Sequence, residues 1–163
     1  MESELEERAH RVLTAFREAG VRLALAEAST GGLMSAALTA LPGASAVVER
    51  GFVPYSNEAK EEQLGVPVEL MVAHGAVSAA VARALAEGAL RHSRADVVLA
   101  ETGIAGPTGG SALKPVGLVY LAVVGHGGGL LEERHVFPGD REAIRRATAA
   151  RGLELLLAWL AHR

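Results

Sequence analysis

Apolar positions in the first part of the chain switch between helical spacing and short uninterrupted runs. Residues 3–19 repeat apolar side chains on one face, and Gly20 follows them, so the spacing predicts a helix that ends at this glycine. The run VRLALAEA at 21–28 predicts a strand, and LMSAALTAL at 33–41 predicts a helix stopped by Pro42-Gly43. The expected inward face of the first helix is Leu5, Ala9, Val12, Leu13 and Phe16.

The pattern continues with a strand followed by a polar helix. VVERGFVPYS at 47–56 predicts the strand, and Pro54 indicates a sheet edge or a bulge near its end. NEAKEEQLG at 57–65 predicts a helix that Asn57 caps and Gly65 closes.

Two helical segments come next, a short one and a long one. PVELMVAHG at 67–75 indicates a short helical turn. Ser78 is placed to cap a helix that runs to about His92. Its expected inward face includes Val81, Leu85 and Ala89.

Three further apolar runs predict strands: DVVLAE at 96–101, VGLVYLAVV at 116–124 and LLEERHVF at 130–137. The first is continuously apolar, as in a strand buried on both faces, whereas the last alternates and indicates a half-exposed edge. GHGGG joins the last two strands as a plausible hairpin. Residues 138–163 predict a helix that Asp140 caps. Its expected inward positions are Ile144, Ala147, Leu153, Leu156, Leu157 and Leu160.

This order of elements predicts the fold class. Helices and strands that alternate, followed by adjacent strands, indicate an α/β protein, a three-layer α/β/α sandwich with a mixed sheet. We expect residues 1–163 to form a single domain. Parallel strands would bring the loops after residues 28 and 101 to the same sheet edge, where open α/β sheets bind ligands.

Composition narrows the function classes. Half of the residues are apolar but only 4% are aromatic, so Ala, Val and Leu must build the core. A formal net charge of −3 without a basic block argues against a nucleic-acid partner. No cysteine is present, which excludes disulfides and a cysteine nucleophile.

Several kinds of segment and site are not expected. No histidine or carboxylate motif at ligand spacing occurs, so we predict no metal and no cofactor. Charges fill the first 20 residues, and no apolar run reaches the roughly 18 residues of a membrane span. We therefore expect a soluble, cytoplasmic protein without a membrane partner.

The turn after the first strand is a candidate site. It contains Ser29, Thr30, Gly31 and Gly32, directly before a helix. Such a turn can bind an anion or an oxyanion, and its hydroxyls can act as nucleophile or donor. The alternative, that Ser29 or Thr30 only caps the helix, stays equally open.

The loop after the strand at 96–101 is the second candidate. It spans 102–115 and has four glycines, and loops of this length inside a domain are often functional. Its backbone amides could wrap a phosphate or an amide group. The alternative is a flexible surface loop. The candidate residues are Thr102, Gly103, Ile104, Ala105 and Gly106.

Tyr55, Asn57 and Lys60 could converge on one pocket, because they lie at the start of one helix. A lysine acts as a general base only where desolvation or nearby cations hold it neutral near pH 7. The alternative is an ordinary solvated lysine.

Arg141 and Arg145 lie four residues apart on a helix and could hold a phosphate together. Pairing with nearby carboxylates on a solvated face is the alternative. Among the histidines, His74 is more readily a turn residue than a catalyst.

Five segments together resemble, in order and spacing, the CinA C-terminal domain family, over about residues 5–160. They are AEASTGG (26–32), GFVPYSNEAKEEQLGV (51–66), AHGAVS (73–78), TGIAGPTGGSALKPVGLVY (102–120) and FPGDREAIRRATA (137–149). The longer competence/damage-inducible members carry a separate N-terminal domain, and this chain resembles the stand-alone form.

The resemblance implies an α/β/α sandwich that hydrolyses the carboxamide of nicotinamide mononucleotide to nicotinate mononucleotide and ammonia, without a metal. It assigns a serine nucleophile in the first turn and a lysine base, which corresponds to Lys60, with Tyr55 nearby. The 102–110 loop and the arginines at 141–146 would hold the nucleotide. The resemblance also implies a homodimer.

One position departs from the family pattern. The family reads A-E-S-C-T-G-G with the first serine as nucleophile, whereas this chain has Ala28 there and Ser29 in place of the cysteine. Two hypotheses follow: an amidohydrolase that attacks with Ser29 or with a water activated by Lys60, or a silenced member that binds a nucleotide or a partner protein. Hydrolysis of a related amide is a third interpretation.

Overall fold

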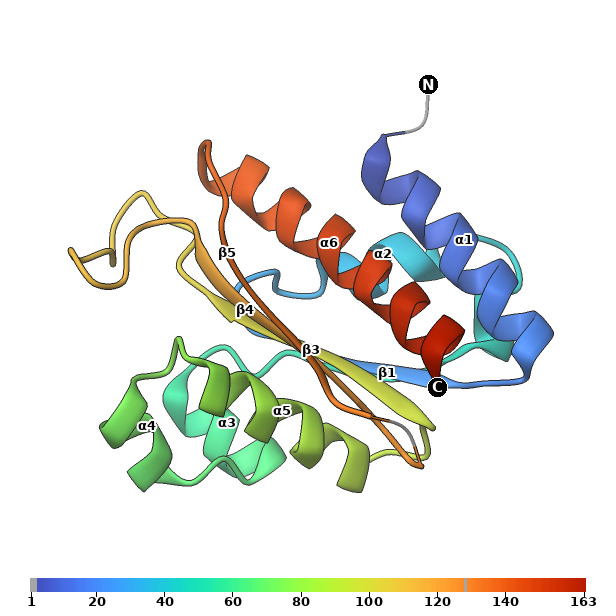
Figure 1. Ribbon diagram of the computed structural model, residues 1–163, viewed down its shortest axis with the longest axis horizontal. Helices are drawn as coiled ribbons and strands as arrows, with labels where there is room; N and C mark the ends of the chain where they lie inside the picture. The colour runs from blue at the N-terminus through green and yellow to red at the C-terminus, as the bar shows by residue number, and fades with distance from the viewer. Residues whose placement is uncertain (1–2, 128) are drawn as a thin grey trace.

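The computed structural model describes residues 3–127 and 129–163, and they form a five-stranded sheet with helices on both faces (Figure 1). The strands are β1 (Leu23–Glu27), β2 (Val48–Phe52), β3 (Val97–Gly103), β4 (Leu118–Gly125) and β5 (Leu131–Val136). Their order in the sheet is β2-β1-β3-β4-β5. β2, β1 and β3 are parallel, while β4 and β5 are antiparallel to their neighbours. The predicted three-layer sandwich with a mixed sheet is confirmed.

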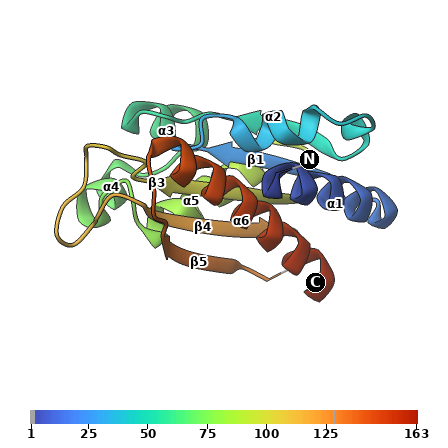
Figure 2. The same cartoon turned by 90° about the horizontal axis from the view of Figure 1, so that it is seen from above.

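Six α-helices divide between the two faces (Figures 1 and 2). One face carries α1 (Glu4–Ala19), α2 (Leu33–Thr39) and α6 (Arg141–His162). The other carries α3 (Asn57–Leu64), α4 (Val68–His74) and α5 (Ala79–Arg91). A short 3-10 helix, Ala44–Ala46, precedes β2. None of these helices, which lie in the described part of the chain, combines the length and apolar character needed to cross a membrane.

Each face of the sheet has its own apolar core. Leu23 and Leu25 of β1 point toward α1, α2 and α6, whereas Ala24 and Ala26 point toward the α5 side. This division follows from the two-residue period of a strand, because successive side chains leave on opposite faces. The small alanines let α5 pack closely on the sheet.

Most predicted helix ends are confirmed. Gly20 closes α1 in a left-handed conformation, and the hydroxyl of Ser78 and the carboxylate of Asp140 cap α5 and α6. The prediction for Asn57 is wrong: the hydroxyl of Ser56 accepts the N–H of Ala59 and caps α3. Asn57 is instead the first helical residue.

Other predictions need smaller corrections. Val68–His74 form a true helix, α4, rather than a turn, and Pro54 lies beyond the end of β2. On α6, Trp159 is buried, while the expected inward positions Ala147, Leu157 and Leu160 are half-buried.

The edge strand predicted at 130–137 is confirmed as β5, and of the edge or bulge that Pro54 indicated for 47–56 the structure shows the edge, since β2 and β5 flank the sheet. β4 and β5 pair as a hairpin would, although residue 128 of the predicted GHGGG connection lies outside the described residues.

The placement of β1 beside β3 prepares the site. These parallel neighbours stay in register from Leu23 and Val97 up to Glu27 and Glu101. Both strands therefore end at one edge of the sheet, and the turn at 28–32 leaves beside the loop that follows β3. The expectation that these two loops meet at one edge is confirmed.

Candidate active site

Two buried carboxylates mark the carboxyl ends of β1 and β3. Glu27 and Glu101 are partners across the two strands, and both side chains are fully buried. The sequence interpretation did not include them. A signal was present, because each is the only charged residue of its strand and follows a run of four apolar residues. Buried carboxylates need hydrogen-bond donors, so their partners define what each one does.

Glu27 binds the start of α2. Its carboxylate accepts the N–H of Met34 at 2.7 Å and, from Ser35, the N–H at 2.9 Å and the hydroxyl at 2.6 Å. Gly32, at the N-cap position, has no side chain to supply these contacts. Glu27 thus satisfies backbone donors that a helix N-terminus leaves free.

Glu101 binds the turn itself. It accepts the hydroxyl of Ser29 at 2.5 Å and the N–H of Thr30 at 2.8 Å. The Thr30 hydroxyl lies 2.9 Å from Glu101 and 2.8 Å from Glu27, so it bridges the two carboxylates. Burial raises the pKa of Glu101, the charge of Glu27 adds to this, and the hydrogen bonds from Ser29 and Thr30 oppose it.

A pocket of about 260 Å³ opens beside this turn, and eight predicted residues line it. Those eight are Ser29, Tyr55, Asn57, Lys60, Thr102, Gly103, Ala105 and Arg141. Ala28, Ala76 and Val77 complete the lining. The predicted residues Thr30, Gly31, Gly32, Ile104, Gly106 and Arg145 lie outside this lining. Segments far apart in sequence, from β1, α3, β3 and α6, therefore meet at one hollow.

Lys60 is buried, which contradicts the solvated alternative. Its side chain is only 4% exposed, and Nζ donates to the carbonyl of Tyr55 at 3.0 Å. Burial lowers the pKa of Lys60, against the opposing charges of Glu101 and Glu58. Desolvation is the condition that the sequence interpretation set for a lysine base.

The two arginines do not converge on one ligand position. Arg141 lines the pocket, donates to the carbonyl of Gly106 at 2.7 Å and reaches the hydroxyl of Tyr55 at 3.4 Å. Arg145 instead donates to the carbonyls of Ser29 and Thr30, at 3.2 and 2.7 Å. It holds the turn in place and leaves Arg141 as the guanidinium that faces the pocket.

Gly103 leaves room next to the Ser29 hydroxyl. A Cβ at residue 103 would lie 3.1 Å from Ser29 Oγ and 2.8 Å from a methyl group of Val119. Both are closer than side chains normally pack. The neighbouring Thr102 donates its hydroxyl to the carbonyl of Ala76 at 2.9 Å and ties this strand end to the start of α5.

The long loop after β3 is attached to the body of the protein. It projects at one end of the molecule in Figure 1. Lys114 donates to the carbonyls of His74 and Val77, at 2.5 and 2.8 Å, and so connects the loop to the segment between α4 and α5. His74 itself ends α4 with an exposed side chain, away from the pocket lining.

A larger hollow of about 510 Å³ lies at the opposite edge of the sheet, where β1 and β3 begin. Its lining includes Gly20, Asp96, His126 and Trp159, and none of the predicted site residues. The smaller pocket carries the Ser29 hydroxyl and the buried Lys60, so we place the candidate site there. Within residues 3–127 and 129–163, no group of three His, Cys, Asp or Glu side chains could hold a metal ion.

Known proteins are similar in sequence to most of this chain. A "CinA-like protein" from Anaeromyxobacter sp. (strain Fw109-5) is 56% identical over 137 residues, which cover 84% of this chain and 33% of the relative. A "CinA-like protein" from Geobacter sulfurreducens is 52% identical over 141 residues, 86% of this chain and 34% of the relative. The chain thus spans about a third of the length of these relatives.

Solved structures match the whole fold. The competence/damage inducible protein CihA from Agrobacterium tumefaciens has a TM-score of 0.95 at 47% identity, over 98% of this chain and 97% of that one. The competence damage-inducible protein A (ComA) from Klebsiella pneumoniae gives 0.93 at 35% identity, over 97% and 98%. The family model for the CinA C-terminal domain matches residues 5–160. The chain therefore belongs to the CinA C-terminal domain family.

Proposed function

We propose that this protein hydrolyses the carboxamide of a nicotinamide nucleotide, with nicotinamide mononucleotide as substrate and nicotinate mononucleotide and ammonia as products. The observation that carries the proposal is the pocket that holds a serine hydroxyl and a buried lysine together at the ends of β1 and β3. A nucleophile beside a group of perturbed pKa is the usual arrangement for acyl transfer. The family resemblance supplies the substrate class.

The roles follow from position. Ser29, or a water molecule, attacks the amide carbon, and Lys60 is the candidate base, since burial lowers its pKa. Gly103 keeps space free for the reacting carbonyl beside Ser29.

The pocket rim suits the rest of a nucleotide. A volume of about 260 Å³ takes a small ring system with its amide, while a ribose phosphate would extend outward. Arg141, Tyr55 and Asn57 line the pocket, and Tyr55 and Asn57 are exposed. A guanidinium and a hydroxyl are common phosphate and sugar ligands.

Ammonia release from nicotinamide mononucleotide by the purified chain tests the proposal. We expect turnover by the native protein and its loss in Ser29→Ala and Lys60→Ala. Turnover that survives in Ser29→Ala but not in Lys60→Ala would favour attack by water. No ammonia from the native chain would refute the enzymatic proposal.

A second candidate function rests on Ala28. This residue lines the pocket at the position of the family's serine and brings no hydroxyl. A silenced member would bind the nucleotide, shown by heat in calorimetry, and would gain ammonia release in Ala28→Ser. That pair of results would favour a nucleotide-binding protein over an enzyme.

We also propose a homodimer. Val53, Val68 and Val72 expose 46%, 44% and 80% of their surface, and a partner subunit of the kind that the family resemblance implies could cover them. Light scattering coupled to gel filtration tests this, and a monomeric mass at micromolar concentration would contradict it.

A further inference from the structure

We propose that Glu101 is the proton acceptor of Ser29, so that these two residues form the catalytic pair and Lys60 serves a different step. This inference rests on the proposed function, because it assigns a role within the same amide hydrolysis. Neither the sequence interpretation nor the family resemblance assigns any role to Glu101.

The contact between the two side chains is direct. Ser29 Oγ donates to Glu101 Oε2 at 2.5 Å. Ser29 lines the pocket, whereas Glu101 is fully buried behind it. The serine therefore presents its oxygen to a substrate on one side and its proton to a carboxylate on the other, as nucleophilic catalysis requires.

The surroundings make Glu101 a stronger base than an exposed carboxylate. Its described hydrogen-bond donors are neutral: the hydroxyls of Ser29 and Thr30 and the N–H of Thr30. Burial and the nearby charge of Glu27 raise its pKa. A general base works best when its pKa approaches the working pH, so this shift favours proton transfer from serine.

Glu27 acts as a positioning residue in this arrangement. It shares the Thr30 hydroxyl with Glu101 and also binds Met34 and Ser35 at the start of α2. The turn at 28–32 is thus fixed by one carboxylate while the other faces Ser29. Arg145 holds the same turn through the carbonyls of Ser29 and Thr30.

The contacts of Lys60 point to a separate role. Its Nζ donates to the carbonyl of Tyr55, while the Ser29 hydroxyl donates to Glu101. Lys60 lines the same pocket and therefore faces the substrate. Its charge acts on the reacting amide rather than on the serine proton.

The reaction balances in two steps. Ser29 Oγ forms a bond to the amide carbon and its proton passes to Glu101. Lys60, which lines the pocket, protonates the amide nitrogen as the C–N bond breaks, which releases ammonia and leaves an acyl-serine. Water next gives a proton to Lys60 and its oxygen to the acyl carbon. Glu101 returns its proton to Ser29 Oγ, and the carboxylic acid leaves.

Covalent labelling of Ser29 by an alkyl fluorophosphonate tests the pair without any nucleotide. The label forms an Oγ–P bond with loss of fluoride, and intact mass with peptide mapping measures its rate and position. We expect labelling at Ser29 in the native chain, with a rate that falls as acid protonates Glu101. In Glu101→Gln the rate should drop at least ~100-fold, the usual contribution of a general base.

Matched variants separate the possible results. Glu133→Gln, the same change on the edge strand β5, should label within about threefold of the native rate at pH 9, because it leaves the proton acceptor in place. Glu101→Asp keeps a carboxylate at a longer reach and should retain a pH-dependent, slower rate. This variant and the native pH profile test the pair even if Glu101→Gln does not fold.

Three outcomes overturn the inference: no label on Ser29 in the native chain, a rate independent of pH between 5 and 9, or a folded Glu101→Gln that labels at the native rate. Labelling that depends on Glu101 without ammonia release would support the pair and refute the proposed substrate. The two failures are therefore distinguishable.

Discussion

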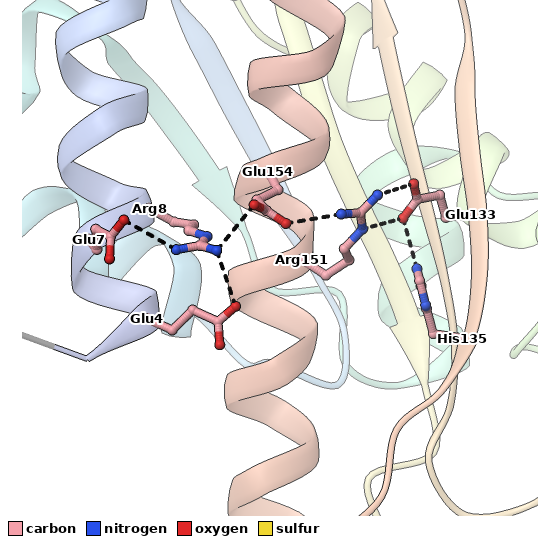
Figure 3. Close-up of polar contacts among 7 residues, drawn as sticks. All are labelled: Glu4, Glu7, Arg8, Glu133, His135, Arg151 and Glu154. Carbon is pink, nitrogen blue, oxygen red and sulfur yellow. Dashed lines mark hydrogen bonds and ion pairs between the residues drawn. The ribbon is translucent and has the colours of Figure 1, made fainter.

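Two carboxylates in this protein, Glu101 and Glu133, have opposite surroundings. Glu133 lies on the edge strand β5, where Arg151 donates to both of its oxygens, at 2.7 and 2.6 Å, and His135 lies 2.8 Å away (Figure 3). These contacts, Arg151 above all, lower its pKa to about 2. Glu101 receives neutral donors, and burial raises its pKa.

Glu133 is one end of a chain of ion pairs across the α1 and α6 face (Figure 3). Arg151 also contacts Glu154, and Glu154 contacts Arg8 of α1. The members of this ladder of ion pairs are Glu4, Glu7, Arg8, Glu154, Arg151 and Glu133, and His135 contacts Glu133 at its end. The ladder joins α1, α6 and β5, elements that are distant in sequence.

The different surroundings of Glu133 and Glu101 show how the same type of side chain can serve either structure or chemistry. An arginine beside a carboxylate fixes its charge and ties elements together, but leaves a poor base. A carboxylate buried among hydroxyls keeps basicity at a cost in stability, which is typical of active sites.

The largest expected effect comes from removing the hydroxyl between Glu101 and the pocket. Ser29→Ala should lower ammonia release by ~10³-fold or more, because the proposed nucleophile is lost. Steady-state kinetics with nicotinamide mononucleotide measure this. Ser93→Ala, the same change on a half-buried serine at the far edge, is the control and should keep native activity. Equal rates in both variants would contradict the role of Ser29.

The next effect tests whether the charge of Lys60 lowers the pKa of Glu101, as the charge of Arg151 lowers the pKa of Glu133. Lys60→Met should lower ammonia release roughly 100-fold, since it removes a titratable group that faces the substrate. It should also move the acid limb of the Ser29 labelling profile to higher pH, because the lost positive charge no longer favours ionised Glu101. An unshifted limb would show that the two charges do not interact.

Glu101→Gln should stabilise the fold although it impairs the chemistry. A raised folded-state pKa means that ionised Glu101 opposes folding, so the penalty is absent below about pH 4.5, grows as pH rises from there to the folded pKa, and is constant above it. We expect a gain of about 1–2 kcal/mol in unfolding free energy at pH 8 and little change at pH 4. Urea unfolding at the two pH values measures it, and a loss at pH 8 would contradict the comparison.

Glu133→Gln should change the unfolding free energy in the opposite direction, and this is the smallest effect that we expect. A lowered folded-state pKa means that ionised Glu133 favours folding above about pH 4.5, and this contribution disappears as pH falls toward 2. We expect a loss of ~1 kcal/mol at pH 7, reduced by salt because the ladder is partly exposed. Unfolding at low and high salt measures it, and ammonia release should stay native.

Much of the fold could be predicted because its signals are local. The inward face of α1, the Ser78 and Asp140 caps and the two edge strands follow from spacing and residue type within one segment. The cap of α3 was missed by one residue, since Ser56 and Asn57 are both good capping residues and the sequence does not say which has extended backbone.

The residues of the candidate site were predicted in separate loops, but the hydrogen bonds that join them were not. Tyr55, Lys60, Thr102 and Arg141 were recognised and do line one pocket with Ser29. The direction of Arg145 was not foreseeable, because a helical i,i+4 pair shares a face without sharing a target.

The sequence by itself determined which segments become helices and strands and which residues stand at the ends of β1 and β3, because periodicity, caps and turn residues act over a few positions. The tertiary structure decided that Glu27 meets Glu101, that Ser29 donates to Glu101 and that Lys60 is buried. These facts depend on strand register and on what packs across the sheet. The proton affinity of a carboxylate depends on its solvent exposure and on neighbouring charges, so the sequence alone could not give the proton affinity of Glu101.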